Sequence, residues 1–141
     1  MFDVVLVGAD DSPTARRAVE AAVEIAETYS SALHIVSAFG AKHIAESASP
    51  AEFRFLNTEG EVDALLQTLS FIATKKGITP VLHAGKGDPT EVVIRVAEEV
   101  HADLVVVGNR GMKGVRRVLG SVPNSIAHGA PCSVMIVDTT E

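Results

Sequence analysis

Five short apolar runs, each followed by a stretch of different periodicity, constrain the fold of this 141-residue chain more than any other feature. The runs are rich in β-branched residues and cover residues 3–9, 31–39, 78–85, 102–108 and 132–138. Continuous apolar runs of this length are typical of strands that are buried on both faces. Alternation with helical segments predicts a mostly parallel sheet with helices on both faces, an α/β fold joined by right-handed crossovers.

The first two helices have recognisable start signals. Ser12 is suited to be an N-cap and Pro13 to be the first helical residue, and the apolar stripe that follows extends to Tyr29. For the next helix the sequence leaves two starts open. One is a capping-box pattern that begins at Ser49, and the other lies near Thr58.

The second half of the chain repeats this organisation. Asp88 and Pro89 are suited to be the N-cap and first residue of a further helix, and a short helix is expected at about residues 121–128. Pro80 lies inside the third apolar run, and since proline cannot donate a ladder hydrogen bond, this run is expected at an edge of the sheet.

Composition excludes several classes of protein. The formal net charge of −6 argues against a chain that grips nucleic acid by charge. One cysteine allows no internal disulfide framework. No apolar run approaches the roughly 18 residues of a membrane span, and no signal-peptide pattern is seen. With no linker or repeat, the sequence predicts one domain over residues 1–141, without a membrane partner, in the cytoplasm.

Unusual residues follow two of the apolar runs, at the ends where open α/β sheets bind ligands. Asp10 and Asp11 follow the first run. After the fourth, Gly108, Gly111 and Gly114 are spaced by threes, and Gly120-Ser121 precedes the short helix. Glycine lets backbone N–H groups approach an oxyanion, and a helix start adds free donors and a positive dipole end. The spacing is compatible with a phosphate site and equally with a surface loop that ends in an ordinary N-cap.

Other chemistries have weaker support. The five histidines show no HxxxH or HExxH spacing, so no metal site is expected, and His34, on a buried-looking run, is interpreted as a satisfied core histidine. The stretch "ADDSPTARR" also resembles the start of a response-regulator receiver domain. That chemistry needs an aspartate at the end of the third strand and a lysine at the end of the fifth, and this sequence has neither there.

The stretches at both ends resemble one family. "VVGNRGMKGVRRVLGSVPNSIAHGAPCSVMIV" resembles the C-terminal signature of the universal stress protein family, and "VVLVGADDSPTARRAVEAA" is similar to its first strand and helix. "GKGDPTEVVIRVAEEVHADLVVVGNRG" matches its third helix and fourth strand. The resemblance covers the chain apart from residues 40–57. It implies an ATP-binding α/β fold with an open five-stranded parallel sheet of strand order 3-2-1-4-5.

The resemblance also implies a set of ligand-binding residues. Asp10 would meet the ribose, with Gly8 and Ala9 near the base, while Val36 and Val107 would line the adenine slot. The phosphates would meet the backbone of these residues: Gly108, Arg110, Gly111, Gly120, Ser121 and Val122. The family pattern is glycine, two residues, glycine, nine residues and then Gly-Ser or Gly-Thr. This chain departs from it, because Met112 to Leu119 are one residue fewer than nine.

The function that follows is an ATP-binding stress-response or signalling module, with ATP alone or with Mg²⁺, acting as a homodimer paired through residues 132–137. One alternative is an enzyme that slowly hydrolyses ATP or transfers its phosphate, but the sequence suggests no catalytic residue that would orient the attacking water. The other is a family member that has lost ATP and acts through its dimer surface.

Overall fold

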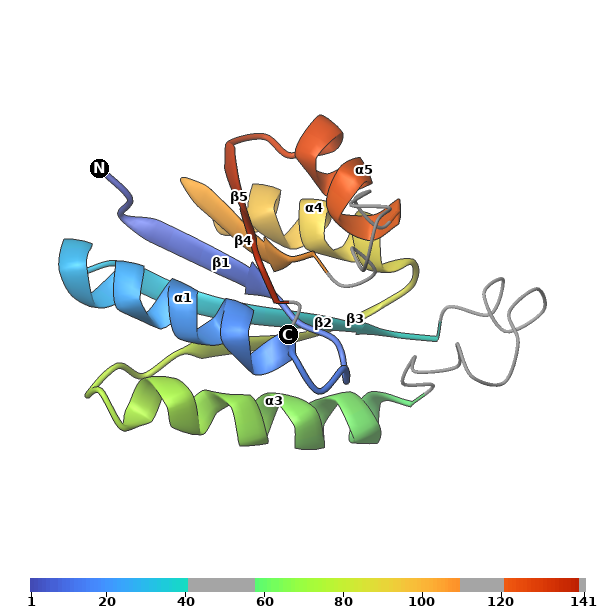
Figure 1. Ribbon diagram of the computed structural model, residues 1–141. Coiled ribbons are helices and arrows are strands. Elements are labelled where there is room, and N and C mark those ends of the chain that lie inside the picture. The colour runs from blue at the N-terminus through green and yellow to red at the C-terminus, as the bar shows by residue number, and fades with distance from the viewer. Residues whose placement is uncertain (41–57, 110–120, 140–141) are drawn as a thin grey trace.

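The computed structural model describes residues 1–40, 58–109 and 121–139 of the chain, in which helices and strands alternate (Figure 1). The possible capping box at Ser49 lies outside these residues, as do Arg110, Gly111 and Gly120. The elements are, in chain order, β1 (Val4–Gly8), α1 (Ala15–Tyr29), β2 (Ala32–Phe39), α3 (Glu59–Thr74), β3 (Val81–Lys86), α4 (Pro89–Glu99), β4 (Leu104–Gly108), α5 (Ser121–Gly129) and β5 (Ser133–Val137).

The sheet confirms the expected topology. Its five strands are parallel and follow the order β3-β2-β1-β4-β5. In the central strand, Val5, Leu6 and Val7 are all completely buried, as a parallel strand covered on both faces should be. The strands β3 and β5 form the two edges. The sequence therefore predicted both the fold class and the strand order.

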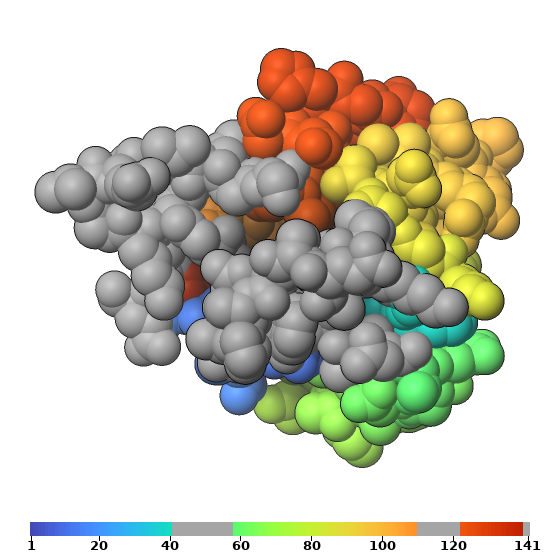
Figure 2. Space-filling model, turned by 90° about the vertical axis from the view of Figure 1, so that its right-hand side faces the viewer, coloured from blue at the N-terminus to red at the C-terminus, as the bar shows by residue number. Residues whose placement is uncertain are grey.

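Helices cover both faces of the sheet (Figure 1). The pair α1 and α3 lies on one face, and the pair α4 and α5 on the other. Figure 2 shows the layers from the side, with the surfaces of α5 (orange-red) and α4 (yellow) above the end of β2 (cyan) and α3 (green) below it.

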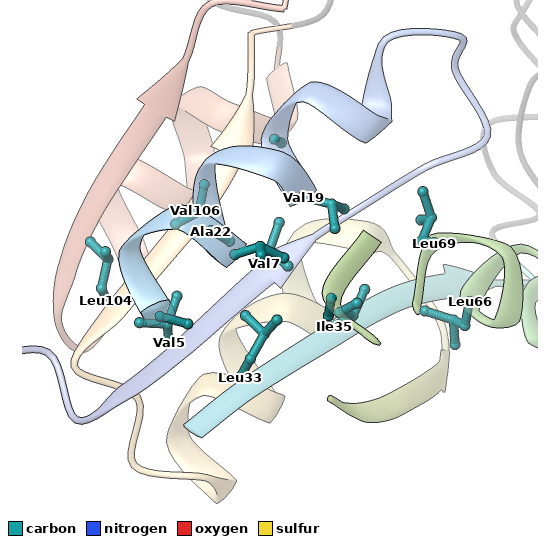
Figure 3. Close-up of a cluster of buried hydrophobic side chains, with 14 of the residues drawn as sticks. Val5, Val7, Val19, Ala22, Leu33, Ile35, Leu66, Leu69, Leu104 and Val106 are labelled. Atoms are coloured by element: carbon teal, nitrogen blue, oxygen red, sulfur yellow. The ribbon is translucent and has the colours of Figure 1, made fainter. Parts of the chain in front are cut away.

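The larger apolar core lies between the sheet and the α1–α3 pair (Figure 3). There Val7 and Ile35 of the sheet pack against Val19 of α1 and Leu66 of α3. Full burial of a side chain of this size stabilises the native state by about 1.5–3 kcal/mol. A second core, around Val36 and Val105, lies under α4 and α5.

The first helix begins later than the sequence suggests. Its N-cap is Thr14, which makes no side-chain capping bond, and the predicted Ser12 cap is wrong. The reason is a local turn that competes with the helix. The N–H of Ser12 donates to Asp10 Oδ1 at 2.9 Å, and the N–H of Ala15 donates to the carbonyl of Ser12 at 3.2 Å.

Two other helix starts follow the predicted chemistry. Of the two starts left open for α3, the structure has the one at Thr58, whose side chain accepts from the N–H of Glu61 while Glu61 reaches back to the N–H of Thr58. Asp88 caps α4 by accepting from the N–H of Glu91, as predicted. The third strand does lie at an edge, but it begins after Pro80 instead of containing it.

Candidate functional site

The carboxyl ends of β1 and β4 lie side by side where the strand order reverses. Val7 pairs with Val106 in the parallel register, so the residues after both strands emerge at the same edge of the sheet. From β1 this edge receives Ala9 and Asp10, and from β4 it receives Asn109. An open α/β sheet binds ligands at such a point because the two chains diverge there to opposite faces.

Asp10 holds the chain as it leaves β1. Its Oδ1 accepts the N–H of Ser12, and its side chain is neither fully buried nor fully exposed. Just before it, the N–H of Ala9 donates to the carbonyl of Val36 at 2.9 Å, which extends the contact between β1 and β2 by one residue. The carboxylate therefore lies on a short, hydrogen-bonded turn beside the point where the strand order reverses.

The two predicted adenine-slot residues, together with Gly8, are packed among apolar side chains beneath this edge. Val36 and Val107 are buried in the core under α4 and α5. At Gly8 a Cβ atom would lie 3.2 Å from Cγ2 of Val93 and 3.5 Å from Cγ1 of Val107. Glycine thus allows α4 to approach the end of β1 closely. That these residues line an adenine slot stays a prediction.

The end of β4 is tied to the chain that follows β5. The N–H of Asn109 donates to the carbonyl of Val137 at 3.1 Å, and its side chain contacts Thr139. A Cβ at Gly108 would lie 2.7 Å from Cγ2 of Thr139, so glycine is required there unless Thr139 moves.

The helix α5 starts with Ser121 and Val122, and Val122 is partly buried against the α4–α5 core. The first N–H groups of any helix lack intrahelical acceptors and carry the positive end of the helix dipole. A carboxylate that accepts from hydroxyls, combined with the N–H donors of a helix N-terminus, is a set of groups that suits a nucleotide. The predicted contacts of Arg110, Gly111 and Gly120, and of the Ser121 side chain, fall outside the described parts of the chain.

A second polar cluster, which the sequence analysis missed, joins β2 to β3. Nδ1 of His34 and Nε2 of His83 are 2.9 Å apart. The ring centres are 5.1 Å apart and the planes differ by 25°, so the rings meet edge to edge in a hydrogen bond. His34 is therefore satisfied, as expected, by a residue 49 positions away, but it is only partly buried and does not belong to the core. Only knowledge of the strand register could have paired the two.

Both histidines resist protonation. Burial lowers the pKa of His34, and the neighbouring His83 lowers it further. Burial also lowers the pKa of His83, although the carboxylate of Glu99 opposes this shift. One ring nitrogen must donate and the other accept, so the hydrogen bond is lost when both nitrogens carry protons.

We expect this pair to make the protein sensitive to mild acid. Above the ordinary histidine value of 6.5, both rings are neutral in the folded and unfolded chains and contribute no pH dependence. Below it the unfolded chain binds protons first, so the free energy of unfolding should fall until the pH drops below the lowered native pKa values. Urea denaturation between about pH 7 and pH 5, above the range of ordinary carboxylates, measures this. Replacing both His34 and His83 with glutamine should flatten the profile, and an unchanged profile would contradict a role of the pair in acid sensitivity.

Other features of the described residues give weaker indications of function. An open depression of about 530 Å³ lies at the amino end of β2, beside Ser30 and Gly77, far from the strand ends considered above. Burial raises the pKa of the Cys132 thiol, which disfavours the reactive thiolate. In the described ranges no three His, Cys, Asp or Glu side chains are placed to share a metal ion. Nor is any helix there long and apolar enough to span a membrane.

The strand order and the site at its reversal point define the open, doubly wound α/β class. Within that class, the chain matches the model of the Universal stress protein family over residues 1–138. It is 32% identical to universal stress protein Rv1636 of Mycobacterium tuberculosis (strain H37Rv), over 99% of this chain and 98% of the relative. The chain therefore belongs to the universal stress protein family.

Solved structures agree with this assignment. A universal stress protein crystallised in complex with cAMP is 31% identical, with a TM-score of 0.77, over 99% of this chain and 98% of that one. A universal stress protein from Archaeoglobus fulgidus in complex with dAMP is 20% identical, with a TM-score of 0.72, over 97% of this chain and 98% of the other. The second likeness supports the fold alone.

Proposed function

We propose that this chain is a cytoplasmic stress-response module that binds ATP at the carboxyl edge of its sheet and acts as a dimer. One observation carries the proposal. A universal stress protein that is 31% identical over nearly the whole chain was crystallised in complex with cAMP, an adenine nucleotide. The same strand ends that receive ligands in this class of fold carry Asp10 and Gly108 here.

Each group has a distinct role in the proposed complex. The Asp10 carboxylate accepts hydrogen bonds from the ribose hydroxyls, and the backbone at Gly8 and Ala9 lies near the base. The backbone of Gly108, Arg110 and Gly111 and of residues 120–122 holds the phosphates, which gain from the positive end of α5. ATP enters alone or with Mg²⁺, whose charge the phosphates themselves would balance.

The proposed activity is binding, with slow hydrolysis at most. Fast hydrolysis requires a residue that orients the attacking water and a fixed set of metal ligands. Beyond the acid pair that follows β1, the sequence suggests no such residue. Nucleotide occupancy would then act by changing conformation or partner affinity.

Cyclic AMP is a second candidate ligand. The relative in complex with cAMP favours it, and so does the stretch between Gly111 and Gly120, which is one residue shorter than the family's ATP pattern. A cyclic monophosphate carries less phosphate for such a stretch to enclose.

Calorimetric titration of nucleotide-free protein with ATP, AMP and cAMP tests the proposal. Saturable binding of ATP, tighter than that of cAMP, is the expected result. Tighter binding of cAMP than of ATP would make cAMP the ligand of this site. No saturable binding of any of the three nucleotides would contradict the proposed function and favour a member that acts through its surface alone.

The open edge at β5 supports the proposed dimer. Because the carbonyl of Val137 accepts from β4, the alternate residues Val134 and Ile136 direct their backbone polar groups to the open side. The strand carries no charge or proline to discourage pairing, and Met135 is 39% exposed. Two copies related by a two-fold axis could pair antiparallel along this edge.

Replacing Met135 with lysine should convert the dimer to monomer. The change would place like charges near one another across the two-fold axis, at a side chain exposed enough for the monomer to tolerate the charge. Sedimentation velocity at micromolar concentration measures the result. Phe71, which is 64% exposed on α3, offers a matched control, because Phe71→Lys should leave the dimer intact. A monomeric parent protein would end this part of the proposal.

A further inference from the structure

A buried polar cluster fastens the end of β4 to the chain that follows β5. Asn109 is 7% exposed and Thr139 is 2% exposed. Asn109 Oδ1 accepts from the N–H of Thr139 at 2.8 Å and from its hydroxyl at 3.1 Å. Asn109 Nδ2 donates to Oδ1 of Asp138 at 3.4 Å. We refer to these three residues as the β4–β5 clamp.

The partners fix the orientation of the Asn109 amide. The N–H of Thr139 can only donate, so the amide oxygen must face it, and the amide nitrogen then faces the carboxylate of Asp138. Burial of an unpaired amide would cost free energy, and here both of its ends have partners. The clamp therefore selects one side-chain orientation at the last residue before stretch 110–120.

The clamp also determines which backbone groups can reach a ligand. The N–H of Asn109 already donates to the carbonyl of Val137, so it is not an available phosphate donor. The methyl group of Thr139 fills the space beside Gly108. With its N–H and its amide oxygen engaged in this way, Asn109 is suited to act indirectly, through the direction in which the chain leaves β4.

We propose that Asn109 and Thr139 are positioning residues for the nucleotide: by anchoring the chain where it leaves β4, they raise the affinity for a nucleotide bound at that strand end. This inference rests on the proposed function. A purely structural role, in which the clamp only holds residues 138–139 against the sheet, would affect stability and leave affinity unchanged.

Two substitutions that exchange the amide of Asn109 and the carboxylate of Asp138 separate the two roles. Asn109→Asp keeps the shape but sets a carboxylate against Asp138, and it should weaken ATP binding roughly tenfold. Adding Asp138→Asn to the same chain restores a donor and an acceptor in reversed order, and most of the affinity should return. Asp138→Asn alone measures the effect of the lost charge. Calorimetry on the full chain, with thermal unfolding alongside, gives both quantities.

Asp103 provides the stability-matched control. Its Oδ2 accepts from the N–H of Asp3 and of Val4 at the opposite end of the sheet. Asp103→Ala should lower the unfolding temperature without changing the affinity for ATP. If Asn109→Asp behaves in the same way, the positioning role is overturned.

Amide hydrogen exchange at residue 109 tests the clamp without any ligand, so it separates this inference from the proposed function. Asn109→Asp should speed exchange of the N–H that donates to Val137 at least tenfold, and Asp138→Asn should slow it again. If exchange does not change, the clamp does not position the chain, whether or not ATP binds. If exchange responds and the parent does not bind ATP, the failure lies in the proposed function, and the proposed effect on affinity falls with it.

Discussion

Replacing Asp10 with alanine is expected to weaken ATP binding by roughly 10- to 100-fold. A charge-assisted hydrogen bond from a ribose hydroxyl to this carboxylate is worth about 1.5–3 kcal/mol, which corresponds to that range of affinity. Calorimetric titration of the variant and the parent measures the difference directly.

Two controls separate ligand binding from structure. Asp10→Asn keeps an oxygen for the N–H of Ser12 but loses the charge, so its affinity should lie between those of the parent and the alanine variant. Asp88→Ala removes a carboxylate that caps α4, and it should cost about 1 kcal/mol of stability with no change in affinity. If the three variants bind ATP equally well, Asp10 does not hold the ribose.

Replacing Gly85 with alanine is expected to destabilise the fold by about 1–3 kcal/mol, as overpacking of a filled core does. Gly85 is buried near the end of β3, where a Cβ atom would overlap Cγ1 of Val92 on α4 and lie 3.2 Å from Arg95 Nη2. Val92 is itself fully buried and cannot turn away into solvent. Urea denaturation of the variant and the parent gives the change in the free energy of unfolding.

The overlap predicts a compensating second change. Val92→Ala removes the atoms that a Cβ at Gly85 would meet, so the double variant should be more stable than the sum of the two single effects implies. A Cβ added at Gly60 in α3 would meet no atom within 4 Å, and Gly60→Ala should be neutral or stabilising by up to about 1 kcal/mol. Strict additivity of the Gly85 and Val92 changes would contradict the close approach of β3 and α4.

Local sequence signals predicted most of the fold. The strand runs were found because parallel strands buried on both faces are continuously apolar, as in Val5 to Val7. The Asp88 cap was found because its chemistry is complete within four residues. Ser12 failed as a cap for a local reason as well, since the chain forms a turn there, in which the N–H of Ser12 donates to Asp10 and its carbonyl accepts from Ala15. The strand order came from the family resemblance and not from any single element.

The polar clusters could not be predicted in the same way. Asn109 and Thr139 are 30 residues apart, and His34 and His83 are 49 apart, so no local pattern joins them. Each pair exists because the parallel register aligns two strands that are distant in the sequence. Of the candidate site residues, Asp10 after β1 and Gly108 at the end of β4 could be picked out from sequence because of where strands end, whereas the clamp required the fold.

The proposed function depends above all on an adenine nucleotide binding where β1 and β4 end. An amide-resolved NMR titration of ¹⁵N-labelled protein with ATP locates the bound nucleotide on the fold. We expect saturable shifts that are largest, among the described residues, at residues 8–10, 108–109 and at Val122. Shifts confined to the depression beside Ser30 and Gly77 at the opposite end of the sheet, or no saturable shifts at all, would contradict this placement of the nucleotide.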